Sequence, residues 1–229
     1  SDLAFVMCPT ILSAPSVLFI SFIKKIFLNK KLVTWIHYAD FEIEAAFQLK
    51  VFNNKLLKRL LFIFEKSILR NADLLSAISF SMIEKMKSKL KKDKQIYYLP
   101  DFIDTKVFSY LNNNKIQNQF YKQLGLQKEV KVIMYSGTMN DKLSCETIIG
   151  TIESLKYRKD ILWLMSGEGP KKEYLMRSLG NIDIFKFYNF QPFKKLPDWL
   201  NIADIHLIPQ KLTSVKFCMP SKLLGIFNV

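Results

Sequence analysis

Short apolar runs alternate with amphipathic stretches along most of the chain. Runs of strand length, rich in β-branched and aromatic residues, predict strands at 2–8, 31–37, 73–78, 96–99, 130–135, 161–166, 184–188 and 205–208. Apolar residues at three- and four-residue steps predict helices up to about 27 and at 42–70, 80–90, 145–155, 171–179, 196–201 and from 220 onward. Strands that alternate with helices are typical of an α/β fold with parallel sheets.

The alternation is interrupted once, by the polar, amide-rich stretch 111–119. A short helix is expected at 120–124, closed by Gly125. This interruption predicts two Rossmann-like domains, 1–108 and 109–229. Ser1 leads directly into an apolar strand and the final helix has no cap, so we expect both domains to be incomplete parts of a longer protein.

Composition narrows the class of protein. Hydrophobic residues make up 49% of the 229, which argues against disorder. Lys and Arg number 34 against 20 acids, a net charge of +14, but arginine is rare, and nucleic-acid readers favour its planar fork. Three distant cysteines indicate neither a disulfide framework nor a zinc cluster. A reducing cytoplasm is the expected location.

Lysines accompany apolar residues in the first third of the chain, at 24–25, 30–31, 55, 58 and 66. They predict either an ordinary amphipathic helix with solvated lysines or an interfacial face meeting anionic lipid. In the second case each basic residue contributes about 1 kcal/mol. The longest apolar run, 11–23, is shorter than the roughly 18 residues that span a bilayer. An anionic membrane surface, the inner face of the plasma membrane, therefore stays open as a partner.

Two glycine-bearing turns follow predicted strands in the second domain, Tyr135–Lys142 and Ser166–Pro170. Glycine lets the backbone approach a phosphate, and the next helix begins with unpaired amides. Lys142 adds a positive charge. Such turns also occur for structural reasons, but both lie at the edge where parallel sheets bind ligands.

His37 ends a predicted strand and is followed closely by Asp40, Glu42 and Glu44. The cluster is either an acid–base or substrate-orienting site, or only the acidic first turn of a helix.

Several short motifs, in order, resemble bacterial family 4 glycosyltransferases of the GT-B fold, most closely the colanic-acid and exopolysaccharide type. They are His37–Ala46, Ala72–Ser79, Leu99–Asp104, Tyr135–Lys142, Gly167–Pro170, Gln191–Pro192, Ala203–Gln210 and Met219–Leu223. The resemblance implies two Rossmann-like domains around a cleft, with the acceptor on the N-terminal domain and a nucleotide sugar on the C-terminal one. It also implies transfer with retention, no bound cofactor or metal, and a UDP- or GDP-sugar as co-substrate.

The resemblance also assigns roles to residues. Gly137, Thr138 and Lys142 would meet the donor diphosphate, and Gly167 and Gly169 would shape the adjacent loop. Gln191 and Pro192 would lie near the base, and Pro220, Ser221 and Lys222 near the donor sugar and phosphates. His37 would orient the reacting sugar, with Asp40, Glu42 and Glu44 on the acceptor side.

The resulting prediction is a peripheral glycosyltransferase that acts on a lipid-linked or polysaccharide acceptor in cell-surface glycan synthesis. A fragment of this kind need not turn over substrate. The rival hypotheses are a non-catalytic sugar-nucleotide-binding or scaffold relative and, less favoured, a basic nucleic-acid-binding protein.

Overall fold

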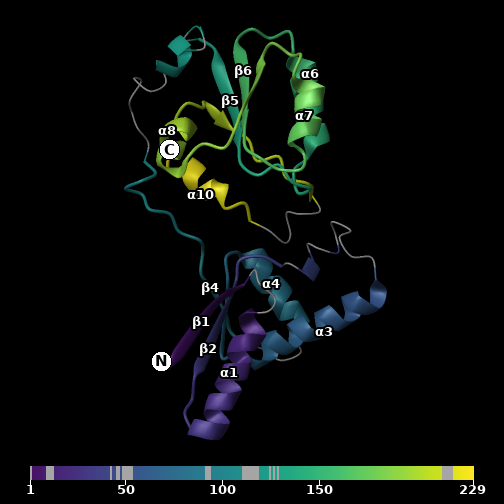
Figure 1. The fold of residues 1–229 in the computed structure, drawn as a ribbon, viewed down its shortest axis with the longest axis vertical. Helices are drawn as coiled ribbons and strands as arrows, with labels where there is room; N and C mark the ends of the chain where they lie inside the picture. Colours follow the sequence, from purple (N-terminus) through teal and green to yellow (C-terminus); the bar gives the residue numbers. More distant parts are fainter. Residues whose placement is uncertain are drawn as a thin grey trace. The chain divides into compact units, whose positions relative to one another are not determined.

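The chain forms two compact units in the computed structural model (Figure 1). The residues that the structure describes are 2–8, 13–41, 43–44, 47, 54–90, 94–109, 119–123, 125, 127, 129–212 and 219–229. Unit 1 is built mainly from residues 1–101, and unit 2 from residues 102–211 and 220–229. The division lies before the predicted boundary at 108, because Phe108 is buried in the core of unit 2.

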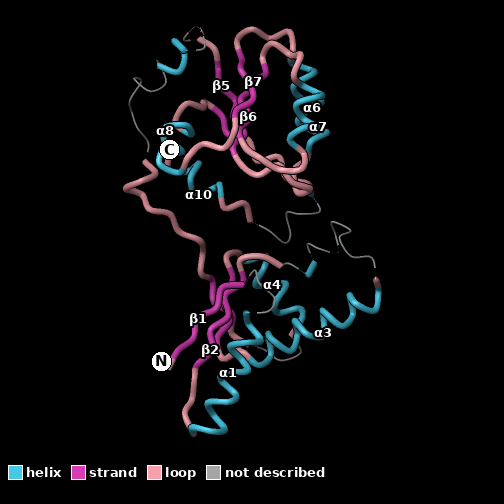
Figure 2. Tube along the Cα trace, in the orientation of Figure 1, coloured by secondary structure: helices cyan, strands magenta, loops and turns pink. Residues whose placement is uncertain are grey.

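Unit 1 contains a parallel sheet of four strands in the order β1-β2-β3-β4 (Figure 2). The strands are β1 (Leu3–Cys8), β2 (Val33–Tyr38), β3 (Leu74–Ala77) and β4 (Ile96–Tyr98). Their neighbouring helices are α1 (Ser13–Leu28), α3 (Lys55–Asn71) and α4 (Phe80–Lys89). The predicted strand–helix alternation of this half is confirmed.

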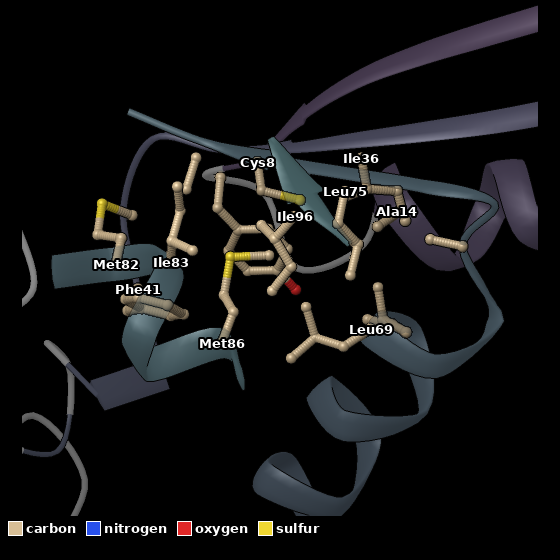
Figure 3. Packing of buried hydrophobic residues seen from close by; sticks show 14 of the residues in the cluster. Cys8, Ala14, Ile36, Phe41, Leu69, Leu75, Met82, Ile83, Met86 and Ile96 are labelled. Carbon is tan, nitrogen blue, oxygen red and sulfur yellow. The ribbon is translucent and has the colours of Figure 1, made fainter. Parts of the chain in front are cut away.

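The core of unit 1 lies between one face of the sheet and these helices (Figure 3). Ile36 and Leu75 project from the sheet toward Ala14 of α1, Leu69 of α3 and Met86 of α4, and all five side chains are fully buried. Alternate residues of a strand point to opposite faces, so His37 lies on the face away from this core.

The start of α3 differs from the prediction of one helix over 42–70. Asn54 has an extended backbone, and its side chain accepts hydrogen bonds from the amides of Leu56 and Leu57 at 2.9 and 3.1 Å. Asparagine is a favoured N-cap, so α3 begins at Lys55. The predicted cap at Ser79 is confirmed, because its hydroxyl accepts from the amide of Met82.

Unit 2 contains a second parallel sheet, in the order β7-β6-β5-β8. The strands are β5 (Lys131–Ser136), β6 (Ile161–Ser166), β7 (Phe185–Tyr188) and β8 (Ile205–His206). The helices are α6 (Cys145–Leu155), α7 (Lys172–Leu179), the 3₁₀ turn η1 (Phe193–Lys195), α8 (Leu196–Leu200) and α10 (Lys222–Phe227). Gly125 has φ +65°, the left-handed conformation expected of a helix-ending glycine.

Both faces of this second sheet are covered. Trp163 and Met165 of β6 point into a cluster with α6 and α7, whereas Leu162 and Leu164 point into another that contains Trp199 of α8. Both clusters are buried. The sheet is therefore held between two layers, and the carboxyl ends of β5 and β6 lie next to each other at one edge.

Candidate functional site

The two predicted glycine turns lie side by side beyond the ends of β5 and β6. The ladder between the strands ends with Ser136 opposite Ser166 and continues into the turns through main-chain hydrogen bonds. The amide of Gly137 donates to the carbonyl of Ser166 at 2.9 Å, and that of Met139 donates to Glu168 at 2.8 Å. The turns therefore form one surface.

Glycine is required at two positions of the second turn. Gly167 and Gly169 have φ values of +150° and +144°, which residues with a Cβ rarely adopt. A Cβ at Gly167 would lie 1.9 Å from the carbonyl oxygen of Gly137, and one at Gly169 would lie 2.3 Å from that of Met139. These glycines allow the two backbones to approach each other.

The hydrogen bonds between the turns also show which amides could meet a ligand. Those of Gly137, Met139 and Gly167 already have carbonyl partners. The amides of Thr138 and Glu168 donate to no backbone carbonyl of the described residues. These two amides, each next to a paired one, are therefore candidates for the predicted backbone cradle for a phosphate.

Lys222, the first residue of α10, brings a positive charge to this surface. A Cβ at Gly137 would lie 2.7 Å from Lys222 Nζ, so this glycine leaves room for the ammonium group. Nζ also lies 3.8 Å from the centroid of the Tyr135 ring, a cation–π contact. Burial lowers the pKa of Lys222 to about 8. In the described part of the chain, no carboxylate forms an ion pair with it.

The remaining residues predicted to contact the donor are spread over several segments of unit 2. Lys142 follows the first turn, and its amide donates to Asn140 Oδ1 at 3.0 Å. Gln191 follows β7 and lines a hollow of about 410 Å³ with Tyr188 and Trp199. Pro192 directly precedes η1, and Pro220 and Ser221 directly precede α10. Among the residues predicted to contact the donor, Lys222 is placed by the structure against Gly137 and Tyr135 of the first glycine turn.

His37 belongs to β2 and lies on the face of the unit 1 sheet that is opposite the helices. It is 3% exposed, pairs with Ser76 in the strand register and stacks against Phe5. Its Nδ1 lies 2.9 Å from Ser76 Oγ, which also accepts the indole N–H of Trp35 at 2.7 Å. Since the indole can only donate, the Ser76 hydroxyl keeps its own proton available for Nδ1, and in that arrangement the ring proton of His37 is on Nε2.

The charge state of His37 follows from its surroundings. Burial lowers the pKa of the imidazole, and the nearby Asp101 carboxylate opposes that shift. A neutral ring that carries its proton on Nε2 is a hydrogen-bond donor, which suits the predicted role of orienting a sugar hydroxyl.

The described acidic residues after His37, Asp40 and Glu44, lie in different surroundings. Asp40 is half-buried just beyond β2, and Glu42 lies outside the described residues. Glu44 is 7% exposed and forms ion pairs with Lys85 and Lys89 of α4, and Lys89 also binds Glu65. The carboxylate of Glu44 is thus a buried partner of two lysines, and its predicted acceptor-side role stays a prediction.

Two residues of the site were not predicted. Ser76 was assigned only to a strand, and Tyr135 only to the start of a turn motif. A hydroxyl inside an otherwise apolar strand is a signal that could have drawn attention to Ser76. Its pairing with His37 depends on the register of two strands far apart in sequence. In the described ranges, no group of three or more His, Cys, Asp or Glu is arranged to hold a metal ion.

Comparisons with known proteins test the family resemblance that the sequence motifs suggested. No protein-family model matches the chain. It is 28% identical, over 204 residues, to an Escherichia coli (strain K12) protein that carries the name colanic acid biosynthesis glycosyl transferase WcaI. The match covers 86% of this chain and 49% of that protein, so the chain spans about half the length of its curated relative.

Solved structures of glycosyltransferases have a similar fold. HepE of Anabaena, in complex with UDP and glucose, superposes with a TM-score of 0.63 at 15% identity, covering 90% of this chain and 52% of its own. WaaG, a glycosyltransferase involved in lipopolysaccharide biosynthesis, gives 0.59 at 14%, covering 90% and 65%. The predicted GT-B fold and the resemblance to glycosyltransferases of the colanic-acid type are confirmed.

Proposed function

We propose that this protein is a retaining glycosyltransferase that moves a sugar from a UDP- or GDP-sugar to a lipid-linked or polysaccharide acceptor in cell-surface glycan synthesis. The observation that carries the proposal is the position of Lys222. Its partly buried ammonium lies beside two glycine turns, with no carboxylate partner in the described part of the chain.

Burying a charge without a partner costs stability, so its presence here needs a reason. A donor diphosphate supplies one, because its oxygens are anionic and gain charge as the sugar leaves. Lys222 and the amides of Thr138 and Glu168 lie at the edge where α/β sheets bind ligands. Donors fixed in place before the reaction stabilise such developing charge.

The other roles complete the proposal. Gln191 and Pro192 lie near the nucleotide base, and Lys142, Pro220 and Ser221 near the diphosphate and sugar. His37 orients the reacting sugar through Nε2, with Ser76 as its positioning residue. The protein acts at the cytoplasmic face of the membrane. HepE, a structural neighbour, binds UDP and glucose, which supports a nucleotide-sugar donor.

Calorimetry with UDP-glucose, GDP-mannose and the free nucleotides tests the donor site. We expect one nucleotide series to bind, and Lys222→Met to weaken it about 10- to 100-fold, the loss of a charged hydrogen bond. Lys186→Met, at an exposed position of β7, is the control and should leave affinity unchanged. No binding by either series, or equal losses in both variants, would contradict the donor site. Binding without transfer in the complete gene product would favour the non-catalytic rival.

A further inference from the structure

Lys222 differs from three other lysines of unit 2 in what surrounds its ammonium group. Lys131, Lys171 and Lys172 form ion pairs with carboxylates, at 2.8, 3.0 and 2.7 Å. Nζ of Lys222 instead lies 3.8 Å from the centroid of the Tyr135 ring, and the side chain is only partly exposed. Without a carboxylate beside it, a partly buried ammonium group gives up its proton more readily than one in water.

The loss of that proton turns the side chain into a nucleophile. Burial lowers the pKa of Lys222 to about 8, against an ordinary value of 10.5. At pH 7 about one amine in ten is therefore neutral, compared with about one in three thousand for an ordinary lysine. Desolvation of this kind is one of the ways in which proteins activate a lysine amine.

The glycine turns place anion-binding groups next to this amine. Nζ occupies the space that Gly137 leaves open, and the amide of the next residue, Thr138, donates to no described backbone carbonyl. The same holds for the amide of Glu168 in the second turn. The carboxylate of Glu168 forms an ion pair with Lys172 at 2.7 Å, so its charge is largely offset by that partner. A phosphoryl group held by these two amides would lie beside a nucleophilic nitrogen.

We infer that Lys222 is a modification site, at which an acyl phosphate transfers its acyl group to Nζ. The lone pair of the nitrogen attacks the carbonyl carbon and forms the new C–N bond. The bond between that carbon and the bridging oxygen breaks, and phosphate leaves with the electron pair. The nitrogen releases a proton to water. The products are a neutral amide at Lys222 and inorganic phosphate.

Two features favour acyl phosphates over other acyl donors. The amides of Thr138 and Glu168 bind the phosphoryl group before the reaction, which holds the carbonyl carbon within reach of Nζ. They also stabilise the charge that the phosphate gains as it leaves. A neutral acyl ester has neither advantage. Acylation removes a positive charge, so the modified surface no longer attracts anions through Lys222.

This inference does not rest on the proposed transfer reaction, because acylation is measured without nucleotide sugar. Acylation of Lys222 in a protein that binds no nucleotide would support the modification site and contradict the donor site. Nucleotide binding without preferential acylation would support the donor site and contradict the modification site.

The test is incubation of the 229-residue chain with acetyl phosphate at pH 7, followed by peptide mass spectrometry. We expect Lys222 to be acetylated at least tenfold faster than the exposed Lys186 of β7, because its roughly 300-fold gain in neutral amine over an ordinary lysine outweighs its lower basicity. Inorganic phosphate should compete for the amides and slow the reaction at Lys222 severalfold, but not at Lys186. Phenyl acetate, a neutral acyl donor, should show a smaller preference for Lys222 that phosphate does not change.

Gly137→Ala tests the geometry of the site. A Cβ there would lie 2.7 Å from Nζ and displace the ammonium group, so acetylation of Lys222 should slow about tenfold. Gly150→Ala is the matched control, because a Cβ there meets nothing within 4 Å, and it should react as the unchanged protein does. Circular dichroism establishes that both variants are folded, and phosphate competition in the unchanged protein serves if Gly137→Ala is not. Equal rates at Lys222 and Lys186, or a rate at Lys222 that phosphate leaves unchanged, would overturn the inference.

Discussion

The two units hold their candidate groups by different means. In unit 2 the turns are fixed by main-chain hydrogen bonds and by glycines that let the backbones touch. In unit 1 His37 is fixed by the side chains of Ser76 and Phe5. A site held by backbone tolerates many side-chain changes but no added Cβ, whereas a site held by side chains depends on each neighbour.

The two sheets also differ in whether helices cover one face or both. Helices cover both faces of the unit 2 sheet, but in the described ranges α1, α3 and α4 all pack on one face of the unit 1 sheet. The other face carries His37, and its Leu3, Phe5 and Met7 are 49–50% exposed. Among the described residues, the helix-covered face of this sheet therefore buries more apolar surface than the other face.

The largest effect is expected for Gly167→Ala, which tests the backbone-held site. The new Cβ would meet the Gly137 carbonyl, and the conformation is strained for alanine, so unfolding free energy should fall by about 3 kcal/mol or more. Urea unfolding followed by tryptophan fluorescence measures it. Gly150→Ala is the control, because a Cβ there meets nothing within 4 Å and should stabilise α6 by about 1 kcal/mol. Similar stabilities would contradict the close approach.

The side-chain-held site is tested by His37→Ala and Ser76→Ala in the complete gene product. His37→Ala should lower kcat about 100-fold with little change in donor affinity, because the reacting sugar is no longer oriented. Ser76→Ala should lower kcat about tenfold and shift its pH profile, as the tautomer of His37 is released. Ser76→Thr should restore the profile. A change in stability alone, with the profile unmoved, would make Ser76 structural only.

Lys222→Met is expected to raise stability while it weakens donor binding. The folded pKa of about 8 lies below the ordinary value of 10.5, so the unfolded chain binds more protons between these values and stability rises with pH there. At pH 7 the variant should be about 1 to 3 kcal/mol more stable than the unchanged protein, and the difference should shrink by pH 10. Urea unfolding at both pH values decides; a less stable variant at pH 7 would contradict the cost of this charge.

The smallest effect is expected on the open face of unit 1. Leu3→Ser should cost about 0.5 kcal/mol or less, because half of the side chain is already in water. Leu75→Ala, on the helix-covered face, should cost about 2 to 5 kcal/mol. Thermal unfolding compares the two. Equal costs would mean that the open face is covered in solution.

Much of the fold could be predicted because its signals are local. The bounds of β6 and α6 match the sequence pattern, since apolar periodicity reports burial directly. The start of α3 could not be predicted from periodicity, because one asparagine side chain decides it.

The site was predictable only in part, for the same physical reason. The glycine turns could be recognised in the sequence, because few other residues adopt their backbone angles. Three other contacts join residues that are far apart in sequence. They are those of Lys222 with Gly137, of Ser76 with His37, and of Glu44 with Lys85. Such contacts follow from strand register and helix docking, which no short motif encodes.

The origin of Lys222 has a consequence for biosynthesis. Both glycine turns are complete once β6 and its following residues have been made, but the ammonium group arrives with α10, more than fifty residues later in the chain. A nascent chain on the ribosome therefore carries the proposed diphosphate site without Lys222 throughout that interval. Under the proposed function, a nucleotide would gain its contact with Lys222, and the stability that this contact adds to unit 2, only after α10 has docked.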